Sequence, residues 1–400
     1  MAKIFPDKFL WGTAISAHQT EGNNTNSDWW HWEQTKEAEG RHWPLEPSGI
    51  ACDSYNRYEE DFDLAKNLNN NAIRISAEWA RLEPIPGSFD EAQFDHYRKV
   101  IKAAKDRGLK VFLTLHHFTS PQWFYEKGGW PMISSPFYFA RYAKKCAEEF
   151  GAEVDHFMTI NEPQVYLGMG YVLGAWFPGK KNIFLAGMIN INFLRAHRRA
   201  YTAIKSVNSN IQVGIVQQIV WHQAFVSTNK IIYFADKCLA KLKFFAMTDA
   251  FLGFLRGKLD FIGLNYYFTE VTKNLSITDS NNDLQNLVWW SEPSGLKNIL
   301  LFLRKYKLPI YITENGLSDD TDLKRIPFLE SMLNVCHEAI ASGTNLKGYF
   351  YWALIDNYEW SQGFWPRFGL VEIDRKNNLE RKPRPSYYFY AKISKQNGLN

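Results

Sequence analysis

The feature that most restricts the fold of this chain is a regular alternation of β-rich runs with amphipathic segments. Each run is rich in β-branched and aromatic residues, as is typical of buried strands. The segments between the runs carry apolar residues at helical spacing. The eight predicted strands span residues 9–16, 72–79, 110–118, 156–162, 212–221, 259–267, 309–314 and 346–354.

A strand followed by a helix, repeated eight times, predicts an α/β fold of the (β/α)8 or TIM-barrel class. Helix candidates 61–69, 90–108 and 329–343 fall between predicted strands, and the last two end in glycine, a common helix C-terminus. The length of 400 residues suits one barrel as well as two ordinary domains. No Pro-, Gly- or Ser-rich linker divides the chain, so we expect a single barrel domain over residues 1–400. The polar segment 278–286 is expected to form a loop.

The charge composition argues against a polyanionic partner. The 46 basic residues barely exceed the 42 acidic ones, which gives a formal charge of +4. No run of like charges marks a patch for nucleic acid or for a membrane. We therefore expect a small-molecule ligand rather than a nucleic-acid or membrane partner, and the composition predicts no particular oligomeric state.

The cysteines predict neither a metal site nor a disulfide framework. The four are widely scattered and form no CxxC motif or Cys/His cluster, so we expect reduced thiols, no bound metal and no cofactor. They are Cys52, Cys146, Cys238 and Cys336. The N-terminal stretch lacks a long apolar region, and no segment approaches 18 uninterrupted apolar residues. A cytoplasmic protein is therefore the expectation.

Two of the predicted strands end in a glutamate that lies beside an asparagine. The sequence "TINEP" places Glu162 at the end of the fourth strand, and "YITENG" places Glu314 at the end of the seventh. In a barrel of this class the catalytic groups lie at the carboxyl ends of the strands, and strands four and seven face each other across the barrel. A lone strand-end glutamate more often forms a salt bridge, but two in these strands indicate a catalytic pair.

Two opposed carboxyl groups above a cleft are the groups that glycoside hydrolysis requires. One protonates the leaving oxygen, while the other attacks the anomeric carbon or activates a water molecule. A separation of about 5–5.5 Å gives retention and about 6.5–9.5 Å gives inversion, so the spacing in the sequence leaves the stereochemistry open.

Seven segments, taken in order, closely resemble the signatures of glycoside hydrolase family 1, the β-glucosidase and β-galactosidase family. They are "FLWGTAISAHQTEG", "AIRISAEWARLEP", "TLHHF", "TINEP", "DFIGLNYY", "YITENG" and "GYFYWALIDNYEWSQGFWPRFGLVEID". The resemblance implies a retaining mechanism in which Glu162 is the acid/base and Glu314 the nucleophile. It also implies that Arg74 lies beside the nucleophile and that Tyr267 orients it. A nearby cation lowers the pKa of a carboxyl group and keeps it ionised, which is what a nucleophile needs.

The same resemblance implies a set of residues that bind the sugar. Amide, imidazole and carboxyl groups suit vicinal hydroxyls, and an indole suits the face of a sugar ring. Matched positions for the glycone are Gln19, His117, Asn161, Trp352, Glu359 and Trp360, and the match for the leaving-group subsite is Trp289. The expected partner is a β-glycoside or oligosaccharide.

Glu359 and Glu162 also bear on the class of substrate. A carboxylate near O4 and O6 of the sugar would repel a 6-phosphate, so we expect unphosphorylated sugars. An intact acid/base at Glu162, where plant thioglucosidases of the family have Gln, favours O-glycosides.

The chain departs from the family pattern at three places. Phe118 stands where Trp is usual, and Gln164 where Trp or Asn is common. Segment 226–258 is shorter than the usual family segment, and a shorter segment is expected to open the cleft.

Two other functions use the same residues. A shortened segment that misplaces a catalytic group would leave a carbohydrate-binding protein without turnover. A transglycosylase would form the same covalent intermediate and pass the sugar to another sugar instead of water.

Overall fold

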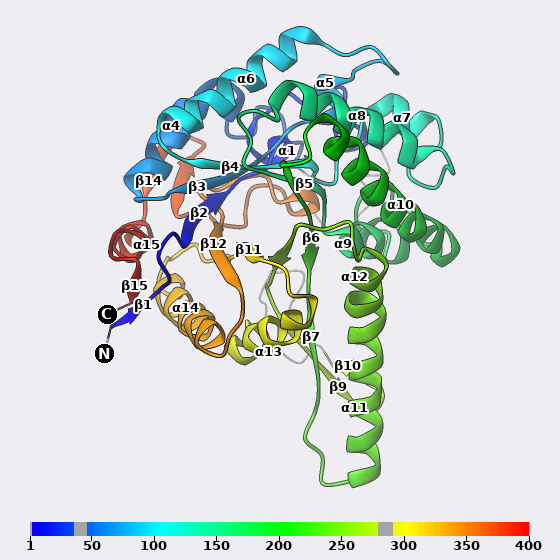
Figure 1. Ribbon diagram of the computed structural model, residues 1–400, viewed down its shortest axis with the longest axis vertical. Helices are drawn as coiled ribbons and strands as arrows, with labels where there is room; N and C mark the ends of the chain where they lie inside the picture. The colour runs from blue at the N-terminus through cyan, green and yellow to red at the C-terminus, as the bar shows by residue number, and fades with distance from the viewer. Residues whose placement is uncertain (1, 36–45, 279–290, 400) are drawn as a thin grey trace.

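The fold of the computed structural model, which describes residues 2–35, 46–278 and 291–399, is built on a closed barrel of eight parallel strands (Figure 1). The last strand pairs with the first in the register Gly348↔Leu10 to Trp352↔Ala14, which closes the barrel. In order, the strands are β2 (Leu10–Ala14), β3 (Ala72–Ser76), β4 (Lys110–His116), β5 (His156–Asn161), β6 (Gln212–Gln218), β8 (Phe261–Asn265), β11 (Ile310–Asn315) and β12 (Leu346–Trp352). The predicted barrel is confirmed, while the single domain over residues 1–400 stays a prediction.

Helices surround this barrel, and their ends follow local sequence signals. In α6 the Asp90 side chain accepts hydrogen bonds from the backbone N–H groups of Ala92 and Gln93, and Gly108 follows the helix with a φ of 76°. A side-chain cap at one end and a glycine in the left-handed region at the other are common helix boundaries. The longer helices are α4 (Ser54–Asn67), α6 (Glu91–Asp106), α8 (Ser135–Phe150), α10 (Ile183–Val207), α11 (Lys230–Phe244), α13 (Pro293–Leu303), α14 (Arg325–Ala341) and α15 (Pro385–Gln396).

Shorter elements occupy the connections between these strands and helices. The short α-helices are α1 (Ala17–Thr20), α2 (Asp28–Glu33), α5 (Trp79–Leu82), α7 (Gln122–Glu126), α9 (Pro163–Leu167) and α12 (Ala250–Phe254). Two π-helical turns are η1 (Gly168–Val172) and η2 (Phe245–Asp249), and two 3-10 turns are η3 (Arg304–Tyr306) and η4 (Trp360–Gln362). Outside the barrel, β1 (Lys3–Ile4) pairs with β15 (Gly398–Leu399), β13 (Val371–Asp374) pairs with β14 (Glu380–Pro383), and β7 (Trp221–Ala224), β9 (Thr269–Lys273) and β10 (Ser276–Thr278) form one sheet.

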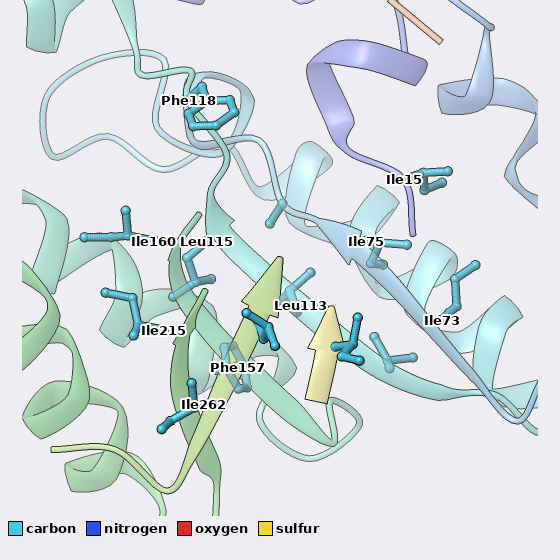
Figure 2. Close-up of a cluster of buried hydrophobic side chains, with 14 of the residues drawn as sticks. Ile15, Ile73, Ile75, Leu113, Leu115, Phe118, Phe157, Ile160, Ile215 and Ile262 are labelled. Carbon is cyan, nitrogen blue, oxygen red and sulfur yellow. The ribbon is translucent and has the colours of Figure 1, made fainter. Parts of the chain in front are cut away.

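The core consists of two apolar layers that the strands separate. Each barrel strand supplies one inward residue to the inner layer, because alternate side chains of a strand point to opposite faces. These residues are Leu10, Ala72, Phe112, Met158, Val216, Phe261, Tyr311 and Phe350. Their neighbours along the strands, such as Ile73, Leu113 and Ile215, belong to the outer layer that packs under the helices (Figure 2).

The predicted strand bounds differ from the observed ones by up to three residues at each end, and one strand and one helix show why. The strand predicted over 212–221 ends at Gln218, and Trp221 begins β7 in the separate small sheet. The apolar run continues past the barrel because the Trp221 ring packs against Phe244 of α11 at 5.3 Å between ring centroids. The helix predicted over 61–69 begins seven residues earlier, at Ser54 of α4. Within the described ranges, no helix has the length and apolarity needed to cross a membrane.

Candidate active site

The two predicted catalytic glutamates lie at the carboxyl ends of β5 and β11. Glu162 follows directly after β5 with a φ of 44°, and Glu314 is the penultimate residue of β11. The pairing of each strand shifts just before its glutamate, between Met158 and Asn161 in β5 and between Ile312 and Glu314 in β11. Such irregularities redirect side chains near active sites. Both side chains consequently point into one cavity.

This cavity has a volume of about 300 Å³ and opens at the carboxyl ends of the barrel strands. Its walls combine the two glutamates with aromatic rings and amides, and none of its described lining residues is Lys or Arg. The predicted residues that line it are Gln19, His117, Glu162, Tyr267, Glu314, Trp352, Glu359 and Trp360. A small cavity with aromatic walls and a few converging polar groups is typical of a small-molecule site.

Glu314 is held by a cation and a phenol. The guanidinium of Arg74 forms an ion pair with one carboxylate oxygen, and the Tyr267 hydroxyl donates to the other at 2.6 Å. Arg74 is itself buried and donates from Nε to the Thr114 hydroxyl at 3.2 Å. Burial and the adjacent Glu314 charge raise the pKa of Tyr267 well above its ordinary value, so its hydroxyl stays a donor. These contacts favour an ionised Glu314.

Glu162 lies in the opposite kind of environment. Burial, and then the negative charge of Glu314, raise the pKa of Glu162 well above its ordinary value. Its described hydrogen-bond partner is Asn265, whose amide donates to Oε1 at 2.6 Å. A carboxyl group held in this way keeps its proton near neutral pH, as a general acid must.

Asn161 joins the two glutamates through shared hydrogen bonds. Its Oδ1 accepts from Arg74 at 2.7 Å and from Asn265 at 3.3 Å. Asn265 is a site residue that the sequence reasoning did not single out. The signal that could have found it is its place in "LNYY", at the end of β8 and two residues before Tyr267, which puts it on the same edge of the barrel.

Aromatic rings line the part of the cavity expected to receive the sugar. The imidazole of His117 lies nearly parallel to the indoles of Trp352 and Trp360, with centroid distances of 6.0 and 6.1 Å. Burial lowers the pKa of His117 well below its ordinary value, so the ring is neutral. A neutral imidazole can donate from one nitrogen and accept at the other, which suits sugar hydroxyls.

Gln19 and Glu359 meet at the same end of the cavity. The Gln19 amide donates to Glu359 Oε2 at 3.4 Å and to the backbone carbonyl of Tyr358 at 3.0 Å. Burial, together with the Glu314 charge, raises the pKa of Glu359 to about 8. Glu359 therefore carries a proton for much of the time at neutral pH.

Comparison with known proteins identifies the family. The model of glycosyl hydrolase family 1 matches residues 1–248 and 234–399. The chain belongs to glycosyl hydrolase family 1. Among its relatives is the rice protein "Beta-glucosidase-like SFR2, chloroplastic", which is 35% identical over 358 residues, or 84% of this chain and 54% of the rice protein. The chain thus spans about half the length of that relative.

Two solved structures resemble the fold closely. A β-glycosidase from Pyrococcus horikoshii is 34% identical, with a TM-score of 0.89 over 100% of this chain and 97% of that one. A β-glucosidase from Thermotoga maritima in complex with castanospermine is 29% identical, with a TM-score of 0.88 over the whole of both chains.

Two of the three departures from the family 1 pattern are single residues, and both line the cavity. Phe118 lines it and packs edge-on against Trp176 and Trp360, at 5.2 and 5.1 Å between centroids. Gln164 lines it beside Glu162. Trp289, the predicted leaving-group residue, lies outside the described residues.

The outer part of the family 1 cavity contains polar residues that the sequence reasoning missed. His222 and Glu270 face each other across the paired strands β7 and β9, with Nδ1 and Oε2 3.0 Å apart. Both residues line the cavity. Their positions follow from the register of the small sheet, which separate sequence runs do not reveal. In the described parts of the chain, no three His, Cys, Asp or Glu side chains are grouped as metal ligands.

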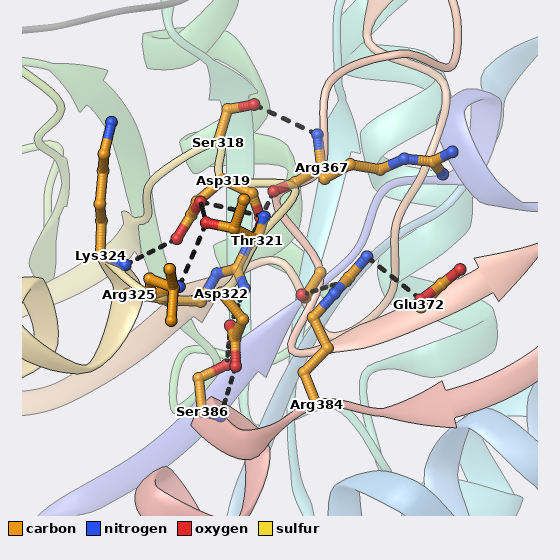
Figure 3. Close-up of polar contacts among 12 residues, drawn as sticks. Ser318, Asp319, Thr321, Asp322, Lys324, Arg325, Arg367, Glu372, Arg384 and Ser386 are labelled. Atoms are coloured by element: carbon orange, nitrogen blue, oxygen red, sulfur yellow. Dashed lines mark hydrogen bonds and ion pairs between the residues drawn. The ribbon is translucent and has the colours of Figure 1, made fainter.

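A buried polar network fixes the loops that follow β11 and β12 (Figure 3). Arg325 forms an ion pair with Asp322 and donates to the backbone carbonyls of Asp319 and Arg367 at 2.6 and 2.7 Å. Arg384 binds both carboxylate oxygens of Asp356, at 3.0 and 2.8 Å. The Arg367 guanidinium also donates to Asp356 Oδ2 at 3.4 Å, so the network ties the loop after Glu314 to the loop between Trp352 and Glu359.

Proposed function

We propose that this glycoside hydrolase is a retaining, exo-acting β-glycosidase of unphosphorylated β-glucosides, with β-galactosides and β-fucosides as further substrates. The observation that carries the proposal is the contrast between two buried carboxyl groups. Arg74 and Tyr267 hold Glu314 as a carboxylate, whereas burial and the Glu314 charge keep the proton on Glu162. One group is prepared to attack and the other to donate a proton.

In the first step, Glu314 attacks the anomeric carbon while Glu162 gives its proton to the leaving oxygen. The bond from carbon to the leaving oxygen breaks, and an ester between the sugar and Glu314 forms. The ester carries no charge, so the repulsion that raises the pKa of Glu162 disappears. Glu162 then ionises and takes a proton from the water that attacks the ester, which returns both groups to their initial states.

The sugar-binding role of the cavity is supported by its chemistry. Gln19 and Glu359 offer amide and carboxyl groups to vicinal hydroxyls, and Trp352 offers an indole face to the ring. The buried amide of Asn161, bound to Arg74 and Asn265, lies next to Glu162 in the chain. The names of the relatives, β-glucosidase and β-glycosidase, support the β configuration.

The preference for unphosphorylated sugars rests on a different feature from the one that the sequence indicated. With a pKa of about 8, Glu359 is too weakly ionised at neutral pH to exclude a phosphate by charge alone. None of the described cavity residues is Lys or Arg, however, so no cation there is available to bind a phosphate.

The test measures aryl release from aryl β-glucoside, β-galactoside, β-fucoside, β-mannoside and 6-phospho-β-glucoside, with the Glu314→Gly variant beside the native protein. We expect release from the unphosphorylated β-glucoside, and a fall of about 10⁴-fold or more in the variant, because the nucleophile is lost. A folded native protein that binds these sugars but releases no aryl group would instead be a binding protein. Transfer to an added sugar acceptor, seen in the products, would indicate a transglycosylase.

A further inference from the structure

The exposed apolar side chains of this protein are concentrated in one part of the chain. Among the described residues, 24 large hydrophobic side chains are exposed, and 15 of them belong to residues 172–254. This segment is about a fifth of the sequence. Scattered exposed apolar residues are ordinary, but a concentration of them marks an interaction surface.

On α11 the exposed apolar residues form a single stripe. Their spacing of three or four residues places them on one face of the helix, which continues into the first residue of η2. The residues of the stripe are Ile231, Phe234, Cys238, Leu242 and Phe245. The exposed fractions of Ile231 and Phe234 are 81% and 70%. This face therefore has no apolar partner within the described chain.

A second exposed apolar face lies on α10 and continues to α12. Ile183, Phe184, Met188 and Ile191 are exposed on the first half of α10. The Arg198 guanidinium donates to the backbone carbonyl of Phe254 at 3.0 Å, which joins α10 to the end of α12. In Figure 1, α10, α12 and α11 follow one another along one side of the molecule, and α11 extends away from the barrel. We name the exposed side chains of α10, α12, η2 and α11 the basic apolar flank.

The charge of this segment is strongly positive. Residues 172–254 contain ten Lys or Arg residues and two acidic ones, a formal charge of +8 compared with +4 for the whole chain. Neither acid offsets the surface charge. Asp236 is buried and accepts hydrogen bonds from the backbone N–H groups of Asn274 and Leu275, and Asp249 forms an ion pair with Lys305.

The cations lie beside the apolar stripe. Lys230, Lys237 and Lys241 are exposed on α11, each next to a residue of the stripe along the helix surface. Arg198 and Arg199 are exposed on the second half of α10. A helix with an apolar stripe flanked by Lys or Arg is typical of segments that lie in the interface of an anionic bilayer.

We propose that the basic apolar flank docks on the surface of an anionic lipid bilayer. A second copy of this chain would bring the same positive charge and be repelled. A nucleic acid would neutralise the lysines but leave the apolar stripe in water. The sequence led us to expect no membrane partner because it contains no run of like charges. The cations are spaced along two helices, α10 and α11, and so form no run in the sequence.

The flank also reaches the mouth of the active-site cavity. Met247 of η2 belongs to the flank, is 44% exposed and lines the cavity. Leu173, which follows η1 and lies outside the flank as defined, is 54% exposed and also lines the cavity. A bilayer that covers the flank would therefore lie next to the cavity opening.

The binding experiment uses the full chain and sedimentation with vesicles. One set of vesicles is phosphatidylcholine alone, and the other contains about 30 mol% phosphatidylserine. We expect binding to the anionic vesicles that weakens as salt is added, because added salt screens the attraction. Cys238 lies in the stripe and is exposed, whereas the other three cysteines are buried. A polarity-sensitive fluorophore on Cys238 should therefore shift to shorter wavelength when anionic vesicles are added.

Matched variants connect the binding to the flank. The triple change Ile231→Ser, Phe234→Ser, Leu242→Ser should weaken vesicle binding by about ten-fold or more. The control changes Ile85→Ser, Ile133→Ser and Leu323→Ser remove three equally exposed apolar residues elsewhere and should leave binding unchanged. A charge variant, Lys230→Glu, Lys237→Glu, Lys241→Glu, leaves the apolar stripe unchanged. It should also weaken binding to anionic vesicles.

Three results would overturn the proposal. They are no sedimentation of the native protein with anionic vesicles, equal binding by the stripe and control variants, and a dimer of the native protein that the stripe variant dissociates. Aryl release from a small soluble glycoside, unchanged in every variant, shows that each remains folded.

Discussion

Asn161 accepts hydrogen bonds from both Arg74 and Asn265, and these two residues bind the two glutamates. At the scale of single residues, the active site is thus one continuous network from Glu314 to Glu162. The ion pair at one end and the neutral acid at the other are held at fixed positions by the same asparagine. Electrostatic coupling between the glutamates follows from this arrangement, because the charge of Glu314 helps to raise the pKa of Glu162.

Neutralising Glu314 should lower the pKa of Glu162. In Glu314→Gln the charge that contributes to the raised pKa is removed, while burial, the larger cause, remains. We therefore expect a pKa of Glu162 that is lower than in the native protein but still above its ordinary value. The measurement is an NMR titration of the Glu162 side-chain carboxyl carbon in both proteins. An unchanged pKa would show that the two groups do not interact.

Replacing Glu162 should affect substrates according to their leaving groups. In Glu162→Gln no proton is available for the leaving oxygen, so alkyl glycosides should lose about 10²–10⁴-fold in kcat/KM. Activated aryl glycosides, which leave without a proton, should lose much less in the first step. Comparing kcat/KM over a series of leaving groups measures the effect. Equal losses across the series would exclude Glu162 as the acid.

The sequence predicted the residues that carry ionisable chemistry at strand ends, and it failed for residues that act through packing or pairing. Glu162 and Glu314 follow from two strand ends and a barrel. Asn265 does not, because a neutral side chain at a strand end has many ordinary explanations. His222 and Glu270 come together only through the register of β7 and β9.

At the scale of elements, the backbones at the carboxyl ends of β11 and β12 lie so close together that a side chain on Gly316 would not fit between them. A Cβ atom on Gly316 would lie 1.8 Å from the carbonyl oxygen of Trp352, whereas a Cβ on Gly187 in α10 would meet no atom within 4 Å. Gly316 follows Glu314 by two residues, and Trp352 ends β12. The close approach of these two strands therefore positions the predicted catalytic Glu314 together with Trp352, the predicted platform for the sugar ring.

Gly316→Ala should disturb this junction and reduce activity. The added methyl group forces β11 and β12 apart, so we expect a loss of stability of about 1–3 kcal/mol and a fall in kcat. Gly187→Ala is the matched control and should be neutral or stabilise the protein by about 0.5–1 kcal/mol, because alanine is favoured in a helix. Thermal unfolding and aryl release check both. A Gly316→Ala protein with native activity and melting temperature would contradict the close contact.

The sequence did not predict the individual helices between β6 and β8. Segment 226–258, which we expected to be shorter than the usual family segment and to open the cleft, contains α11, η2 and α12. These helices lie between the barrel strands β6 and β8, where the strand-and-helix repeat requires a helix. The overlap of the two family matches, over residues 234–248, falls in the same segment.

At the scale of the whole molecule, the overall stability depends on pH through the active site. Glu359 has a folded-state pKa raised to about 8 from an ordinary value of 4.5, so the folded protein keeps a proton that the unfolded chain has lost. At a pH between 4.5 and about 8, unfolding therefore releases the proton of Glu359. The resulting contribution to stability is complete below pH 4.5 and is lost as the pH rises through 8.

Glu359→Gln should remove this dependence and raise the melting temperature by a few degrees near pH 8, because an amide needs no proton to remain neutral. The advantage over the native protein should be smaller at pH 5, where the native Glu359 is protonated in the fold. Calorimetry of both proteins at the two pH values measures the difference. A melting temperature raised equally at both would assign the effect to packing instead.

The pair formed by β1 and β15 brings the two described ends of the chain together, in the register Lys3↔Leu399. The Asn397 side chain adds to this contact, accepting from the Trp11 indole at 2.9 Å and donating to the Phe5 carbonyl at 2.8 Å. Figure 1 shows both ends on the side away from α11. Because the described ends lie side by side, a short peptide could join them. New ends made in an exposed turn such as 208–210 would then give the same barrel from a circularly permuted gene.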